Sequence, residues 1–364
     1  MIVVTKIGTS SITTDDGDID AAAVAKFCRE AAALRVQGHR VVLVTSGAIA
    51  AGLPALGYTN GDRPRDAVTL QAASAVGQTR LMRVYESALA DHDLVSGQVL
   101  LAPLDFTIRQ QYLHARATLG RLLDLGVVPV VNENDAIADD EIRFGDNDRL
   151  AALVAHLIAA DLLVLLTDAP GLLTADPRLD SSASLIEEIM EVDHVIEAMA
   201  GGTGSARGSG GMASKLAAAK IAAWSGVKAV IAQASRDGVL EAAVAGEAGA
   251  GTVIHPKAKR LPARKLWIAF AVGSSGTIVV DDGARRALLD RGVSLLPAGI
   301  SDVKGSFEVD DAVEIAGTDG KVFAKGLVRL GSVGLRDVAG HRTTDLAEGM
   351  PHEIVHRDDL VVLP

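Results

Sequence analysis

The chain has 364 residues, which is enough for one large domain or two domains of ordinary size. Hydrophobic residues make up 49% of it, so it can bury a substantial core, and its formal net charge of −11 argues against a general affinity for nucleic acid or an anionic membrane. Cys28 is the only cysteine, which excludes an internal disulfide and a multi-cysteine metal site.

Neither the first residues nor the most apolar stretch of the chain suggests a membrane protein. The first residues, MIVVTK, lack the basic and long apolar regions of a secretion signal. The most apolar stretch, Leu150–Leu166, contains His156 and Asp161, so we interpret it as a helix, a turn and a buried strand rather than a membrane span. We therefore expect a cytoplasmic protein that does not enter membranes.

Short Val, Ile and Leu runs alternate with longer alanine-rich helical patterns over residues 1–255. The predicted strands are Ile2–Thr5, Val41–Thr45, Gln98–Leu101, Val127–Val131, Leu162–Leu166 and Val227–Ala232. The predicted helices are Asp20–Val36, Asp66–Ala90, Thr107–Leu125, Asp148–Ala159, Val192–Ala200 and Ala213–Trp224. This alternation predicts an α/β fold, a three-layer, doubly wound, mainly parallel sheet with helices on both faces. Ligands of such sheets bind beyond the carboxyl ends of the strands.

The pattern changes after residue 255. A basic, proline-containing stretch predicts a linker over 256–275, and short strands separated by glycine and aspartate turns predict a small β-rich domain over 276–364. This last domain has ten Lys and Arg against fifteen Asp and Glu, a net charge of −5. Such a balance favours a regulatory or structural role over RNA binding.

Glycine turns follow the first two strands. In KIGTS, Lys6–Ser10, the backbone N–H groups and the lysine ammonium can hold phosphate, and the alternative is a lysine that merely ends the strand. In TSGAIAAG, Ser46 can cap the next helix while Gly47 lets a ligand approach the backbone. Capping and ligand binding are compatible here.

Two later segments are candidates for binding a nucleotide. Thr167 and Asp168 end a strand, where they either touch a ribose or adenine or form an ordinary turn. Glycines before the helix that begins near Ala213 can bind an anion, although the segment is not a P-loop. Lys215 falls in the first turn of that helix, where a cation is disfavoured unless it faces an anion.

The segment VNENDAIADDEIRFGDND, residues 131–148, contains seven carboxylates and three asparagines but fails the spacing of an EF-hand loop. Its middle residues, 139–141, are compatible with a solvated loop. Asp135 can pair with an ammonium group, Asn147 can donate and accept hydrogen bonds, and Asp148 can pair with lysines near a phosphate. A zwitterion such as an amino acid needs this mixture of groups.

Several segments in this order resemble glutamate 5-kinase, a family of the amino-acid kinase superfamily, and the region from about Gly276 resembles a PUA domain. These segments are KIGTS, VTSGAIAAG, LQAASAVGQ, VNENDAI, FGDND, TDAPGLLTADPR and GGMASK. His114 stands where the family often has asparagine, and the loop over 201–209 is difficult to match.

The resemblance implies transfer of the ATP γ-phosphoryl group to the side-chain carboxylate of L-glutamate. The product is γ-glutamyl phosphate, in the first step of proline biosynthesis. It also implies Mg²⁺ carried with ATP, feedback inhibition by proline, and a homo-oligomer, a dimer or a tetramer, assembled through the kinase domain. Kinases for aspartate, N-acetylglutamate or a nucleotide remain alternatives, although Asp135 as an ammonium partner argues against N-acetylglutamate, whose amine is blocked.

Together, the residues and the resemblance give an expected site with no protein ligand for a metal. Catalytic roles fall to Lys6, Asp148 and Lys215, and glutamate binding to Ser46, Asp135 and Asn147. The expected ATP-binding residues are Lys6, Gly8, Thr167, Asp168, Ser209, Gly210, Gly211, Met212, Ala213, Ser214 and Lys215.

Overall fold

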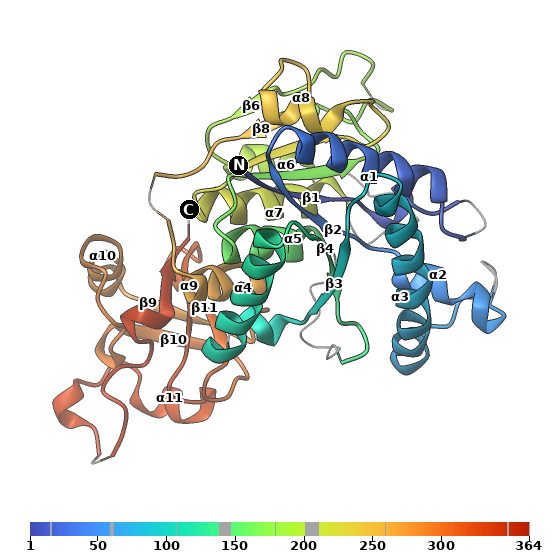
Figure 1. The fold of residues 1–364 in the computed structure, drawn as a ribbon. Coiled ribbons are helices and arrows are strands. Elements are labelled where there is room, and N and C mark those ends of the chain that lie inside the picture. Colours follow the sequence, from blue (N-terminus) through green and yellow to red (C-terminus); the bar gives the residue numbers. More distant parts are fainter. Residues whose placement is uncertain are drawn as a thin grey trace. The chain divides into compact units, whose positions relative to one another are not determined.

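The chain divides into two compact units, Met1–Arg260 and Leu261–Pro364 (Figure 1). The computed structural model describes residues 1–14, 17–58, 62–106, 108–137, 147–178, 180–200, 211–258, 260–347 and 349–363. The boundary between the units falls inside the stretch predicted as a linker.

In the described part of unit 1, eight strands form one sheet in the order β3-β4-β2-β1-β5-β7-β8-β6. The strands are β1 Ile2–Lys6, β2 Arg40–Val44, β3 Ser96–Leu101, β4 Val128–Glu133, β5 Leu162–Thr167, β6 Glu188–Ile189, β7 Lys228–Gln233 and β8 Thr252–Ile254. Neighbouring strands are parallel except for β7 and β8, which pair antiparallel. The predicted mainly parallel sheet is confirmed.

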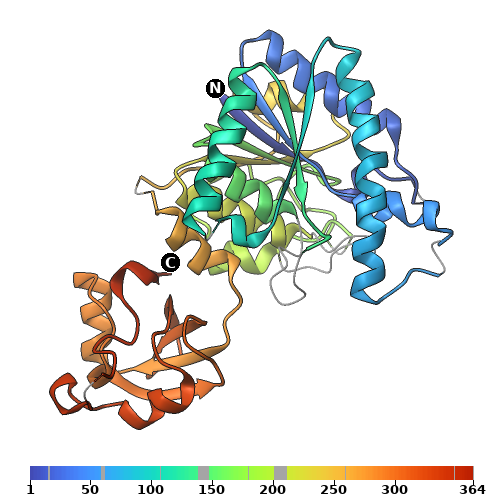
Figure 2. The same ribbon diagram turned by 60° about the horizontal axis from the view of Figure 1, so that its bottom comes forward.

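Helices cover both faces of this sheet, so unit 1 has three layers (Figures 1 and 2). The helices are α1 Ala21–Val36, α2 Ala48–Gly52, α3 Ala67–Ala90, α4 Arg109–Asp124, α5 Asn147–Leu157, α6 His194–Ala200, α7 Met212–Trp224 and α8 Val239–Ala245. The two views place α1, α3 and α8 on one face and α4, α5 and α7 on the other. The strands β1, β4 and β5 are almost wholly buried between these layers, which explains the apolar residues that make up most of each strand.

Local sequence signals account for most of these boundaries. The Asp20 side chain accepts hydrogen bonds from the N–H groups of Ala22 and Ala23, and Asp66 accepts one from Thr69, so each caps the helix that follows it. The predicted elements of unit 1 all occur, with ends within two residues of the expected positions. The short elements β6, β8 and α8 were not predicted. No helix in the described residues is long and apolar enough to cross a bilayer.

Unit 2 has its own sheet, in which the described strands follow the order β10-β9-β11-β12-β13. Its elements are α9 Ala263–Leu266, β9 Gly276–Val280, α10 Asp282–Arg291, β10 Ile300–Gly305, β11 Ala312–Gly317, β12 Val322–Leu327, α11 Ser332–Val338 and β13 Leu360–Val362. A separate apolar core packs around this sheet, with Ile278, Val313 and Ile315 at its centre. The predicted small β-rich domain is therefore confirmed.

Candidate active site

The carboxyl ends of the central strands lie level at one edge of the sheet of unit 1. Lys6, the last residue of β1, pairs with Val44 of β2 and with Leu165 of β5, and Val44 pairs in turn with Val131 of β4. Side chains at or just beyond these positions therefore lie close together. Most of the predicted catalytic and glutamate-binding residues are found there.

A buried cluster of three charges occupies this edge. The Asp148 carboxylate, in the first turn of α5, lies 2.6 Å from Lys6 Nζ through Oδ1 and 3.2 Å from Lys215 Nζ through Oδ2. The Asp148 side chain is 0% exposed, and those of Lys6 and Lys215 are 4% and 6% exposed. The structure thus brings together the three residues expected to be catalytic.

The two lysines favour the ionised form of the Asp148 carboxyl. Burial alone raises the pKa of the Asp148 carboxyl, but the ammonium groups of Lys6 and Lys215 and a hydrogen bond from Ser214 outweigh it and lower that pKa below its ordinary value. The two ammonium groups that flank this carboxylate are also suited to an anionic ligand such as a phosphate.

The N-terminus of α7 faces the same cluster. Gly211 is the N-cap residue of α7, and the helix begins at Met212, so Ala213, Ser214 and Lys215 complete its first turn. The Ser214 hydroxyl lies 3.0 Å from Asp148 Oδ2 and 2.9 Å from the Gly211 carbonyl. The backbone N–H groups of a first turn form an anion site together with the lysine. The predicted residues Ser209 and Gly210 lie outside the described residues.

Next to the charges lies a cluster of neutral polar groups. The Asn147 side-chain amide donates to the Thr45 carbonyl at 2.6 Å, to Asn132 Oδ1 at 2.6 Å and to Ser46 Oγ at 3.1 Å. The prediction that Ser46 caps the next helix is wrong. Gly47 is the N-cap residue of α2, in the left-handed region at φ 89°, and the Ser46 hydroxyl instead accepts from Asn147.

Asp135 lies two residues beyond the end of β4 and is half-buried. Its Oδ2 accepts a hydrogen bond of 2.6 Å from the Ser74 hydroxyl of α3. No sequence pattern predicts a role for Ser74 or for Tyr85, whose hydroxyl donates to Thr45 Oγ1 at 2.8 Å. Both lie on the buried face of a long helix, and the only signal for Ser74 was its position in the segment LQAASAVGQ.

The predicted nucleotide residues of β5 line a separate hollow. Thr167 is buried and its hydroxyl donates to Asp168 Oδ1 at 3.0 Å. Both residues line a cavity of about 550 Å³ that is also bounded by Ser10 and Ser235. A side chain on Gly8 would place its Cβ 3.7 Å from Lys6 Nζ, so this glycine lies directly beside the charge cluster.

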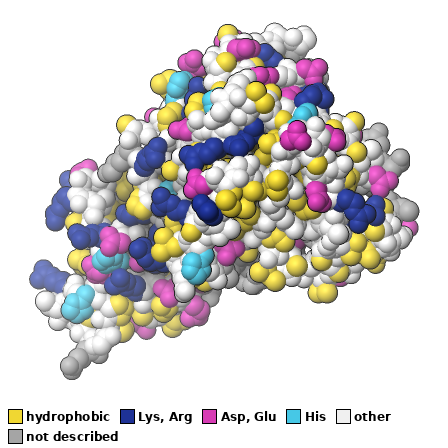
Figure 3. Space-filling view, viewed as in Figure 1, with side chains coloured by type: hydrophobic (Ala, Val, Ile, Leu, Met, Phe, Trp, Pro, Cys, Tyr) yellow, Lys and Arg dark blue, Asp and Glu magenta, His cyan; other side chains and the backbone are white. Residues whose placement is uncertain are grey.

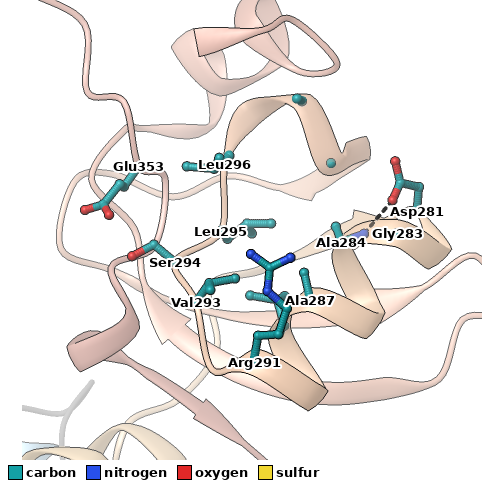
Figure 4. A pocket seen from close by; sticks show the side chains of 13 residues that line it. Asp281, Gly283, Ala284, Ala287, Arg291, Val293, Ser294, Leu295, Leu296 and Glu353 are labelled. Carbon is teal, nitrogen blue, oxygen red and sulfur yellow. Dashed lines mark hydrogen bonds between the residues drawn. The ribbon is translucent and has the colours of Figure 1, made fainter.

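Unit 2 contains a cavity of about 580 Å³ between α10 and the segment that leads to β10. In Figure 4 the Arg291 side chain lies between Glu353 on one side and Asp281 on the other. Charged groups from several elements do not converge here as they do in unit 1. The charge cluster of unit 1 is therefore the stronger candidate for an active site.

Within the described ranges, no three His, Cys, Asp or Glu side chains are grouped so that they could hold a metal ion. Asp148, the most buried carboxylate of the site, is already engaged by two lysines and a serine. Among the described residues, the two lysines of this site are therefore suited to an anionic ligand.

Comparisons with known proteins identify the family of the chain. The family model of the amino acid kinase family matches residues 1–233, and that of the PUA domain matches residues 276–350. A glutamate 5-kinase of Pelobacter propionicus is 46% identical over 365 aligned residues, which cover 99% of this chain and 97% of that protein. A glutamate 5-kinase of Burkholderia vietnamiensis matches with the same identity and coverage.

Solved structures support the fold. The isopentenyl phosphate kinase of T. acidophilum, solved as a product complex, superimposes with a TM-score of 0.51 at 18% identity, covering 70% of this chain and 100% of that one. The chain belongs to the amino acid kinase family and, within it, to the glutamate 5-kinases.

Proposed function

We propose that this protein transfers the γ-phosphoryl group of ATP to the side-chain carboxylate of L-glutamate. The product, γ-glutamyl phosphate, enters proline biosynthesis. The relatives named glutamate 5-kinase support this reaction. The observation that carries the proposal is the buried Lys6–Asp148–Lys215 cluster. The polar cluster of Asn147 lies next to it, because Asn147 and Asp148 are consecutive residues. The catalytic domain in this proposal covers 1–255, followed by a linker over 256–275 and a PUA-like domain over 276–364.

The charge cluster serves the phosphoryl group. Two anions, a carboxylate and a triphosphate, must approach each other, and the ammonium groups of Lys6 and Lys215 reduce their repulsion. The same groups stabilise the charge on the transferring phosphoryl group. Asp148 orients the two lysines. The reaction needs no strong base, because a carboxylate nucleophile is already deprotonated at pH 7.

The polar cluster serves the amino acid. Ser46 and Asn147 lie together at the end of β2 and the start of α5. Here the Ser46 hydroxyl can donate to a carboxylate oxygen, and the side-chain carbonyl of Asn147 can accept from an ammonium group. Asp135 faces the ammonium group of glutamate in this proposal. A free amino group is therefore required of the substrate, which separates glutamate from N-acetylglutamate.

The nucleotide binds beside the lysines. The first turn of α7, from Gly211 to Ser214, supplies N–H groups for the phosphates, and Ser209 and Gly210 precede it in the sequence. Gly8 lets the phosphates approach the turn after β1, and Thr167 and Asp168 lie along the nucleoside. The substrate is MgATP, in which Mg²⁺ neutralises charge on the phosphate oxygens.

The proposal includes feedback inhibition and an oligomeric state. Proline, as the end product, inhibits by feedback, and the kinase domains associate into a dimer or tetramer. Exposed apolar side chains near the sheet edge at β3, namely Val95, Ile108 and Leu113, are compatible with such an interface. The location is cytoplasmic.

Nucleic acid is not a partner in this proposal. On the face of unit 2 that Figure 3 shows, Lys and Arg side chains lie among acidic and histidine side chains. The sequence of this region, with its net charge of −5, supports the same view.

The test is ADP release from MgATP with L-glutamate, L-aspartate, N-acetylglutamate or UMP as acceptor, with hydroxylamine present to trap an acyl phosphate. We expect turnover with L-glutamate and formation of the γ-hydroxamate. Turnover with another acceptor alone would contradict the assignment of Asp135 and Asn147 while leaving the phosphate site in place.

A further inference from the structure

One motif of the sequence has no role in the reaction described so far. LQAASAVGQ, residues 70–78, lies in α3, and its polar and glycine residues Ser74, Gly77 and Gln78 are all buried. They stand at positions i, i+3 and i+4, so they share one face of the helix. This face is directed toward the glutamate-binding side of the site, as its contacts show.

Gly77 fixes the distance between α3 and α2. A Cβ on Gly77 would lie 1.7 Å from the Ala48 carbonyl oxygen, and a Cβ on Gly52 would lie 1.8 Å from the Ala73 carbonyl oxygen. The backbones of the two helices are therefore in direct contact. Because α2 begins directly after Ser46 and Gly47, this contact places α3 against the loop that binds glutamate.

Ser74 connects α3 to Asp135. Its side chain is 1% exposed, and its hydroxyl donates to Asp135 Oδ2 at 2.6 Å, which is the length of a hydrogen bond to a charged acceptor. Gln78, one turn later, makes a longer bond of 3.4 Å to the Glu133 carbonyl at the end of β4. The helix thus holds the segment of Asp135 at two points.

We propose that Ser74 is a positioning residue for recognition of the substrate ammonium group, because it fixes the Asp135 carboxylate in its binding orientation before glutamate arrives. An immobilised carboxylate loses less freedom when it pairs with the ammonium than a mobile one does. The inference rests on the proposed role of Asp135.

The test compares Ser74→Ala with the wild-type enzyme. Loss of a hydrogen bond to a charged group should raise the KM for L-glutamate about 10-fold, with kcat and the KM for ATP changed less than about 2-fold. Glutarate, which lacks the α-amino group, reports on packing alone. As a competitive inhibitor it should bind Ser74→Ala and the wild type equally well.

Two further variants separate this role from a general effect on the helix. Ser87→Ala removes an exposed serine of the same helix and should change no kinetic constant. Ser74→Cys replaces the hydroxyl with a somewhat larger thiol that donates a weaker hydrogen bond, so it should give an intermediate KM, and it replaces Ser74→Ala if that variant does not fold.

The outcomes distinguish this inference from the proposed function. If Asp135→Ala raises the KM for glutamate and Ser74→Ala does not, Ser74 has no positioning role. Equal weakening of glutamate and glutarate by Ser74→Ala would also overturn the inference, since the effect would then be one of packing. In the Asp135→Ala background, the serine substitution should add less than about 2-fold. If Asp135→Ala itself leaves the glutamate KM unchanged, the fault lies in the proposed glutamate site.

Discussion

The phosphate side and the glutamate side that we propose for the site are built from different kinds of interaction. On the phosphate side, two ammonium groups and one carboxylate are buried in contact. On the glutamate side, amides and hydroxyls bind one another, and the charged Asp135 is half-buried. Preorganised charge acts most strongly where charge develops during the reaction, whereas neutral hydrogen bonds act on shape and orientation. We therefore expect damage to the first half to lower kcat and damage to the second half to raise the KM for glutamate.

The largest expected effect is that of Lys215→Ala. It removes a preorganised donor from the transferring phosphoryl group, so kcat should fall about 10²-fold or more while the KM for glutamate changes little. Steady-state kinetics with varied glutamate and ATP measure both constants. Lys220→Ala is the matched control, because Lys220 lies on the same helix but pairs with the half-exposed Glu197. A loss of only a few-fold with Lys215→Ala would remove this residue from catalysis.

Gly77→Ala tests the glutamate side through its helix packing. The added Cβ meets backbone at 1.7 Å, so α2 and α3 must separate, and we expect a loss of about 1–3 kcal/mol in the free energy of unfolding. The KM for glutamate should rise more than that for ATP. Gly120→Ala is the contrasting control, since a Cβ there meets nothing within 4 Å and should stabilise α4 by up to about 1 kcal/mol. Denaturant unfolding of both variants measures the difference, and equal stabilities would contradict the close packing.

The smallest expected effect is a pH dependence of stability, and it concerns the two ionisable groups at the ends of α5. Asp148, at its start, has a lowered pKa and stays ionised at neutral pH. His156, in its last turn, has a pKa lowered to about 4 by burial and by the nearby Arg260 and Arg116. The unfolded state therefore binds more protons than the folded state, and stability present above about pH 6.5 should be lost as the pH falls to about 4.

We expect this loss to be about 1–2 kcal/mol, because His156 is partly exposed to solvent. Unfolding measured at a series of pH values, with His156→Gln and the exposed His92→Gln as control, isolates the contribution. The same pH dependence in His156→Gln as in the wild type would show that another group is responsible.

Much of this architecture follows from sequence patterns. The buried strands and amphipathic helices were predictable because each has a periodicity of its own, and Lys6, Asp148 and Lys215 were found because each stands at the end of a strand or the start of a helix. The roles of Ser74 and Asn132 were not predictable, because they depend on the packing of α3 and on the register between β2 and β4. Ser46 was misread as a cap because the positive φ of Gly47 moves the start of α2 by one residue.

The adjacency of Asn147 and Asp148 sets a limit on how this enzyme can change. At the start of α5, the Asn147 side chain binds the Thr45 carbonyl and Asn132, whereas the Asp148 side chain binds Lys6 and Lys215. Their Cα atoms are about 3.8 Å apart, as in any trans peptide, so the two halves of the proposed site are joined by a covalent link that no side-chain substitution alters. In the proposed site, changes in α3 or after β4 can adapt the pocket to another phosphoryl acceptor, whereas we expect an insertion between Asn147 and Asp148 to separate the acceptor from the phosphoryl group and to abolish turnover.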